Sequence, residues 1–300
     1  MSTGSYIRRF WQLYAMLLLP VSFFALFKYG PMYGVTIAFK DYNIFQGIWQ
    51  SPWNGTETFR EIFDMQTFKT ALRNTFLLNF LDLAVSFPAP IILALMLNEV
   101  RQMRVKRVFQ TVMYFPHFIS WVIIGGLFLQ IFATNSGIIN QMLNHAGFQS
   151  IPFLSNKYWW LATYLVAGVW QSVGWGTIIY LAALTGINKE LYEAAETDGA
   201  GRMKRMWHIT LPGIRPTILM LLILAIGEMP RIGFERPFVL GNSMVSDFSE
   251  VLSTFVYKIG LQTGEFSIAT AVGLFQSVIA LVFLLGANTI TRKFADQSIV

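Results

Sequence analysis

Long apolar runs separated by polar segments dominate the pattern of side chains along this chain. The first run covers residues 10–27 and extends past Pro31 towards residue 39. Others cover residues 75–97, 108–132, 159–184 and 268–290, and a shorter run begins near residue 216. A helix needs about 20 predominantly apolar residues to cross the hydrocarbon core of a membrane. The pattern therefore predicts six transmembrane helices in an all-α integral membrane protein.

The apolar runs leave little room for a separate soluble domain. We expect residues 1–300 to form a single transmembrane domain, with a core at about 70–293 and with the first span plus an outer loop in 1–69. Within the mixed-charge loop 40–73, Thr58 and Glu61 have capping-box spacing, and Phe59, Ile62 and Phe63 form an apolar stripe. This spacing predicts a short helix on the outer surface that begins at Thr58.

Composition supports a membrane location. The chain is 54% hydrophobic and 13% charged, whereas soluble domains average about 45–50% and about 25%. The net charge of +6 is no sign of nucleic-acid binding, because the basic residues cluster in loops between spans. Cysteine is absent, which excludes thiol catalysis, and His117, His145 and His208 lack ligand spacing. We therefore expect no metal site and no catalytic residues.

The basic residues also predict an orientation, because cytoplasmic loops are enriched in Lys and Arg. The loop 133–158 contains a single Lys or Arg residue, Lys157. Six spans place the basic segments on one side, so both termini are predicted to be cytoplasmic. These segments are Arg8–Arg9, residues 101–107, residues 189–215 and Arg292–Lys293.

Residues 188–213, here called the elbow, are too polar to lie in lipid and join the fourth and fifth spans. Asn188 is a suitable N-cap, since its side-chain oxygen can accept a free helical N–H. Glu190 and Glu193 follow in the first turns, where the helix dipole favours anions. Gly199 and Gly201 predict a turn into a second short helix. The elbow is therefore expected to be a helix, a glycine turn and a helix on the cytoplasmic side.

The elbow contains Glu193-Ala194-Ala195, then Gly199 four residues later, and further on Ile209, Leu211 and Pro212. This run resembles the EAA signature of ATP-binding-cassette (ABC) import permeases of the binding-protein-dependent, type I class. This resemblance implies a coupling helix that docks into a separate ATPase subunit. The alternative is an ordinary amphipathic linker helix at the membrane surface. The residues that the resemblance assigns to ATPase coupling are Glu190, Glu193, Ala194, Ala195, Asp198, Gly199, Ile209, Leu211 and Pro212.

Further similarity extends over about residues 28–293. The segments 31–42, 51–53, 254–261 and 271–278 resemble Lpl-type polysaccharide and oligosaccharide permeases, relatives of the maltose permeases. The resemblance implies an ABC ATPase dimer, a second homologous permease subunit, an extracytoplasmic solute-binding protein and a saccharide substrate. It also implies a bacterial cytoplasmic (inner) membrane location. No Walker A run occurs, so ATP and magnesium belong to the ATPase and this chain binds no cofactor.

Charged residues interrupt the fifth span. Glu228 lies about 17 Å along the helix from residue 217, near the middle of the membrane. We expect Glu228, Arg231, Glu235 and Arg236 to line the solute path or its outer gate. The alternative is that these side chains form ion pairs with one another. Asp82 in the second span, together with Asn79, is a further path candidate, or else it binds a neighbouring span.

Two other classes of membrane protein are compatible with the same composition. A membrane-embedded enzyme needs acids, bases or metal ligands clustered at one membrane face, whereas the candidates here are scattered. A sensor or scaffold would bind an ATPase without moving solute. The interrupted fifth span favours a path, and small residues every fourth position, including Gly168 and Gly176 in the fourth span, predict close helix packing.

Overall fold

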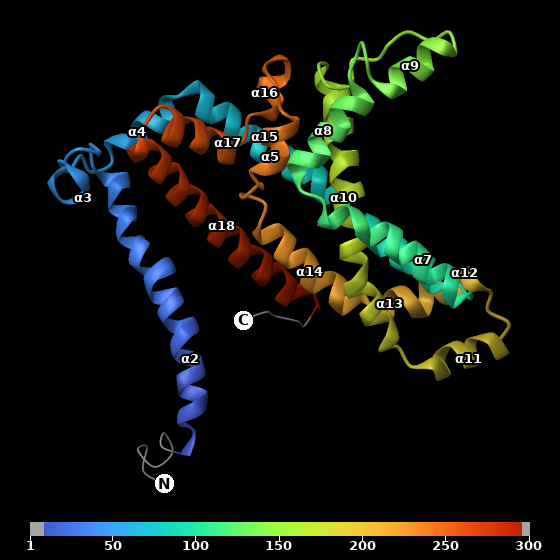
Figure 1. Cartoon of the computed structure of the whole chain (residues 1–300). Coiled ribbons are helices and arrows are strands. Elements are labelled where there is room, and N and C mark those ends of the chain that lie inside the picture. Colours follow the sequence, from blue (N-terminus) through green and yellow to red (C-terminus); the bar gives the residue numbers. More distant parts are fainter. Residues whose placement is uncertain (1–8, 296–300) are drawn as a thin grey trace. The chain divides into compact units, whose positions relative to one another are not determined.

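The computed structural model describes residues 9–295, and its regular elements are helices apart from one isolated bridge between Lys40 and Trp53. The chain divides into two compact units (Figure 1). The first unit comprises residues 9–65 with Val256–Phe275, and the second comprises Gln66–Phe255 with residues 276–295. The all-helical fold class is confirmed, while the single domain stays a prediction.

The first unit begins with a 29-residue helical segment, Trp11–Phe39, which is long and apolar enough to cross a membrane. This confirms the first span and its extension past Pro31. Within the segment, an α-helix passes into π and 3₁₀ turns. The elements of this unit are α2 (Trp11–Phe24), η1 (Ala25–Tyr29), η2 (Gly30–Phe39), α3 (Gly47–Gln50), α4 (Glu57–Asp64), η6 (Lys258–Gln262) and the start of α18 (Phe266–Ala295).

The short helix predicted in the loop exists as α4, but its predicted start is wrong. Thr56, not Thr58, is the N-cap residue, and its side chain makes no capping hydrogen bond. Gly55 adopts φ +67°, a turn conformation that favours glycine, so the helix begins two residues early. Thr58 lies inside the helix, where its hydroxyl accepts a hydrogen bond from Asn54 Nδ2 at 2.9 Å.

In the second unit, the second and fourth spans are long helices. Span two is Gln66–Asn98 and begins nine residues earlier than predicted, because its polar first turns still bury Phe68 and Ala71. The next turn buries Asn74, which donates to Asp247 O and Glu250 O. The elements involved are α5 (Gln66–Ser86), α6 (Pro88–Asn98) and α10 (Lys157–Thr185).

The third span is not the continuous helix that its apolar run predicts. The helical segments Met103–Phe118 and Trp121–Phe132 meet at 103°. Pro116 lies in the 3₁₀ turn before the bend, and Ser120 caps the next helix by accepting from Ile123 N at 3.5 Å. The elements are α7 (Met103–Tyr114), η3 (Phe115–Phe118) and α8 (Trp121–Phe132).

The interruption predicted in the fifth span is confirmed, since α14 (Arg215–Gly227) ends directly before Glu228. Helix α14 meets the elbow segment Arg202–Gly213 at 58°. Among the described residues 9–295, four helices are long and apolar enough to cross a membrane, and the number rises to six if each bent pair is one span. The elements that follow α14 are α15 (Glu235–Leu240), η5 (Ser243–Val245), α16 (Ser246–Ser249) and α17 (Leu252–Tyr257).

The loop between the third and fourth spans contains a helix that hydropathy did not predict, α9 (Ile138–His145). Buried Asn140 holds this loop together, since it donates to Ala133 O and Ile151 O and accepts from Ile151 N. Helices α9 and α11 (Lys189–Thr197) lie towards opposite ends of α10 (Figure 1).

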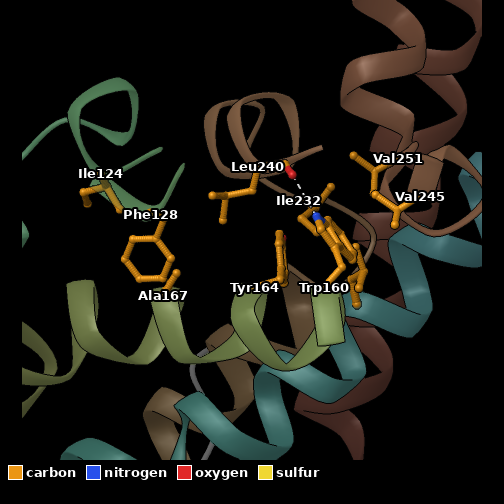
Figure 2. Close-up of a cluster of buried hydrophobic side chains, with 10 residues drawn as sticks. Ile124, Phe128, Trp160, Tyr164, Ala167, Ile232, Leu240, Val245 and Val251 are labelled. Atoms are coloured by element: carbon orange, nitrogen blue, oxygen red, sulfur yellow. Dashed lines mark hydrogen bonds between the residues drawn. The ribbon is translucent and has the colours of Figure 1, made fainter. Parts of the chain in front are cut away.

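The main core of the second unit is built on one face of α10. Trp160 and Tyr164 are fully buried there, and the Trp160 Nε1–H donates to Leu240 O at 2.8 Å, as Figure 2 shows. Figure 2 also shows Phe128 of α8 above Ala167 of α10. This core joins the segments that follow the breaks in the third and fifth spans. Its buried members are Leu78, Ile124, Phe128, Trp160, Tyr164, Ala167, Ile232, Leu240, Val245 and Val251.

Small residues let other helices approach α10 closely, as predicted. At Gly176, which belongs to the predicted stripe, a Cβ would lie 2.9 Å from Pro90 Cγ of α6, and at Gly174, which does not, a Cβ would overlap Met113 O of α7. These glycines therefore mark packing faces.

Candidate functional site

The elbow begins with the predicted helix cap. Asn188 Oδ1 accepts a hydrogen bond from Glu190 N at 3.0 Å, and Asn188 Nδ2 donates to Glu190 Oε2 at 3.1 Å. Two side chains therefore fix the start of α11, and Glu190 places its carboxylate in the first turn, where the helix dipole favours it.

The predicted glycine turn is also present, and its hydrogen bonds form a Schellman motif. Ala200 N donates to Ala195 O at 2.8 Å, and Gly199 N donates to Glu196 O at 3.0 Å. Gly199 has φ +75°, which strains any residue with a side chain. Gly201, with φ −67°, precedes the next helix without such strain.

Side chains tie the two arms of the elbow together. Tyr192 donates its hydroxyl to Thr210 Oγ1 at 3.0 Å, and Glu196 forms a 2.9 Å ion pair with Arg205. The second arm is a mixed helix rather than one regular α-helix. It consists of α12 (Arg202–Arg205), the π-helical η4 (Met206–Thr210) and α13 (Leu211–Gly213).

The structure brings the predicted coupling residues together on this elbow and leaves most of them accessible. Three large apolar side chains are exposed beside them: Leu191 (53%), Met203 (63%) and Trp207 (59%). The coupling role itself stays a prediction. Among its candidates, Ala195, Ile209 and Leu211 are half-buried, and Glu190, Glu193, Ala194, Asp198, Gly199 and Pro212 are exposed.

The second candidate site lies at the break in the fifth span. Arg236 forms an ion pair with Asp82, with Nη2 3.1 Å from Oδ2 and Nη1 3.2 Å from Oδ1. Both side chains are largely shielded, with 12% and 27% exposure. Asp82 therefore binds a neighbouring element, as one of its two alternatives proposed, and it also lines both cavities described below.

The other three path candidates present their side chains to open space. Glu228, Arg231 and Glu235 are exposed, and within residues 9–295 none of them forms an ion pair. The alternative of mutual pairing among the four charges of the fifth span is therefore wrong, since the partner of Arg236 is Asp82.

Two cavities meet at these residues. The larger, of about 440 Å³, is lined by Asn79, Asp82, Trp121, Tyr164, Ile232, Gly233, Phe234, Glu235 and Arg236. The smaller, of about 250 Å³, is lined by Asn79, Asp82, Leu83, Ser86, Phe87, Ala225, Glu228, Met229 and Arg231. All five path candidates line one cavity or both, so the structure groups them although their roles remain untested.

Sequence reasoning missed three members of this site. The guanidinium carbon of Arg236 lies 4.0 Å from the ring centre of Tyr164 and 5.7 Å from that of Trp121. Gly168 lies one turn beyond Tyr164 and leaves room for the same guanidinium. The available signal was the Tyr164-to-Gly168 spacing, which puts both residues on one face of the fourth span.

The part of the chain that the structure describes holds no group of three or more His, Cys, Asp or Glu side chains arranged to bind a metal ion. His117 instead stacks on Trp175, with ring centres 4.6 Å apart.

Four long apolar helices, two bent helix pairs and cavities lined by charged side chains at a broken span are the features of a multi-span α-helical membrane permease. The chain belongs to the family of binding-protein-dependent transport system inner membrane components, whose model matches residues 86–296. It is therefore an inner-membrane transport subunit and not an enzyme.

Two named relatives align with nearly the whole length of this chain. Protein LplB of Bacillus subtilis (strain 168) is 45% identical over 287 residues, which cover 96% of this chain and 90% of the relative. The polygalacturonan/rhamnogalacturonan transport system permease protein YteP of the same organism is 45% identical, with 96% and 89% covered.

A solved structure shares the fold. The crystal structure of a bacterial ABC transporter involved in the import of the acidic polysaccharide alginate contains a chain that is 39% identical, with a TM-score of 0.90. The match covers 97% of this chain and 99% of that one.

Proposed function

We propose that this chain is a membrane-spanning permease subunit of an ABC importer for oligosaccharides or polysaccharide fragments. The observation that carries the proposal is the near-full-length similarity to YteP, named for polygalacturonan and rhamnogalacturonan, and to the alginate transporter chain. A permease named for arabinooligosaccharides, AraP of Bacillus subtilis (strain 168), is also 32% identical over 77% of this chain.

ATP hydrolysis takes place on a separate ATPase dimer, which binds ATP and magnesium, and this chain binds no cofactor of its own. The elbow is the docking element. Exposed Glu193 offers a carboxylate for a charge-assisted hydrogen bond to a basic residue of the ATPase. Exposed Leu191, Met203 and Trp207 supply apolar contact area beside it.

The complex contains a second, homologous permease subunit and receives its saccharide from an extracytoplasmic solute-binding protein. A second alginate transporter structure supports this assembly, because it is described in complex with an alginate pentasaccharide-bound periplasmic protein. Its matching chain is 38% identical to this one, with a TM-score of 0.90.

The chain crosses the bacterial cytoplasmic membrane six times, with both termini in the cytoplasm. The basic residues of the elbow support this orientation, and so does the position of α9 and α11 towards opposite ends of α10 (Figure 1). The other basic segments include Arg8, which lies outside the described residues, and Arg292 and Lys293, whose side chains the structure does not describe.

Transport follows alternating access. ATP closes the ATPase dimer, the docked elbow moves with it, and the spans change from inward-facing to outward-facing. ATP drives this cycle only if the docked ATPase binds it more tightly in one permease conformation than in the other. The free charges at the cavities, Glu228, Glu235 and Arg231, favour neither acidic nor neutral saccharides.

Co-purification tests the proposal. Affinity-tagged chain isolated from its native membrane in mild detergent should bring down an ATPase and a second multi-span permease. The isolated complex should hydrolyse ATP. Recovery of the intact chain without either partner, from membranes in which both are expressed, would contradict the proposal.

A further inference from the structure

The break in the fifth span leaves backbone groups that a continuous helix would have satisfied. Helix α14 ends at Gly227, and residues 228–234 follow without a regular helix until α15 begins at Glu235. Pro230 contributes no N–H at this point. An unsatisfied backbone carbonyl is costly where water is scarce. A donor from another element would satisfy such a carbonyl group without water.

Asn79 of α5 supplies this donor. Its Nδ2 donates to Met229 O at 2.7 Å and to Arg231 O at 3.2 Å. A single amide thus satisfies two carbonyl groups on either side of Pro230.

Asp82, three residues further along α5, holds the next part of the same segment. Both of its carboxylate oxygens contact the Arg236 guanidinium, at 3.1 and 3.2 Å, a two-point geometry that also fixes orientation. Ser86 donates its hydroxyl to Asp82 Oδ1 at 2.8 Å. Since residues three apart lie on one face of a helix, Asn79 and Asp82 act on the break from the same side.

The fourth span completes the seat for Arg236. A Cβ on Gly168 would overlap Arg236 Nη1 and would lie 3.4 Å from Asp82 Oδ1. The guanidinium also lies against the ring of fully buried Tyr164. The absent side chain at Gly168 is therefore what allows the ion pair to lie against α10.

We propose that Asn79 and Asp82, here called the clamp, position the broken middle of the fifth span. Asn79 holds the carbonyl groups at the break, and Asp82 fixes α15 through Arg236 in the gap that Gly168 leaves. Arg236 is then a positioning residue rather than a saccharide ligand, because its charge is neutralised by Asp82. The relevance of the clamp to transport rests on the proposed function, whereas the effect of the clamp on stability does not.

A double-mutant cycle on the purified full-length chain tests the pair. Asp82→Asn and Arg236→Gln should each lower the thermal unfolding midpoint by about 5–15 °C, because each leaves a shielded charge without its partner. In the double variant, the midpoint should fall by clearly less than the sum of the two single decreases. Arg236→Lys, which keeps the charge but loses the two-point contact, should lie between wild type and Arg236→Gln.

Arg231→Gln is the matched control, since that guanidinium is exposed and forms no ion pair within residues 9–295. It should shift the midpoint by no more than about 2 °C. Strictly additive losses in the double variant, or an Arg236→Gln loss no larger than that of Arg231→Gln, would overturn the proposal.

A second arm keeps the test decisive if Arg236→Gln does not fold. Gly168→Ala should displace the guanidinium and lower the midpoint, whereas Gly126→Ala in α8, where a Cβ would meet nothing within 4 Å, should not. Equal midpoints for the two alanine variants would overturn the proposal. Because these readouts need no partner chain, their failure is distinguishable from a failure to recover an ATPase.

Discussion

The elbow and the break in the fifth span are both polar interruptions of an apolar chain, but they use their charges differently. The elbow leaves Glu193 exposed, and a single ion pair, between Glu196 and Arg205, joins its two arms. At the break, Arg236 is shielded and bound by a carboxylate from another helix. One region leaves a charge accessible at the surface, and the other pairs its charge within the chain.

This difference follows from the surroundings of each region. An exposed charge keeps its hydration and remains free to bind a partner. A shielded charge must be paired within the chain, because leaving it alone is costly. We therefore expect substitutions at the elbow to change coupling more than stability, and substitutions around the break to do the reverse.

The largest effect on stability is expected at the core beneath the break. Trp160→Ala removes a fully buried ring and the N–H that binds Leu240 O, and should destabilise the chain by about 3–5 kcal/mol. Its neighbour Trp159 is 43% exposed, so Trp159→Ala should cost only about 1 kcal/mol. Thermal unfolding of the purified chain measures both, and similar losses would contradict the assigned core.

The largest effect on coupling is expected at Glu193. Glu193→Ala should remove the charge-assisted hydrogen bond that we propose to the ATPase and so weaken ATPase binding about 10–100-fold, with the spans still inserted. Glu196→Ala is the control, since that carboxylate is already paired with Arg205. ATPase affinity and transport-coupled hydrolysis, measured on the reconstituted complex, compare the two. Unchanged coupling in Glu193→Ala would count against docking through this residue.

A smaller effect is expected at the turn of the elbow. Gly199→Ala places a side chain at φ +75° and should cost about 1–2 kcal/mol of local stability. Gly201→Ala, at φ −67° and with no atom within 4 Å of the added Cβ, should be tolerated. Hydrogen exchange of the elbow amides reports on both variants, and equal protection in the two would show that the turn conformation is not limiting.

The smallest effect is expected at the start of the elbow. Asn188→Ala removes the side-chain acceptor for Glu190 N and should cost about 1 kcal/mol, seen as faster amide exchange in the first turn of α11. Exchange at the far end of the elbow should not change. Unaltered exchange in the first turn would mean that the cap contributes nothing there.

Local sequence was enough to predict the elbow. Its cap and glycine turn depend on neighbouring residues only, and the structure confirms the predicted roles of Asn188 and Gly199. The apolar runs likewise identified the membrane-crossing segments, because hydropathy depends on composition alone.

Long-range pairing was not predictable in the same way. Asp82 and Arg236 are 154 positions apart, and nothing in either segment specifies the other. The 103° bend in the third span was also missed, because Pro116 and Ser120 lie within an otherwise apolar run. Hydropathy measures the character of a run and not its direction.

The most direct test places a thiol on the elbow. The chain contains no cysteine, so the Met203→Cys variant would have a single cysteine, at an exposed position. In native membranes, a thiol-reactive cross-linker at this position should join the chain to the ATPase, and an impermeant thiol reagent added outside intact cells should not label it. Labelling from outside, or a fully assembled complex that gives no cross-link to the ATPase, would contradict a cytoplasmic elbow that couples ATP hydrolysis to transport.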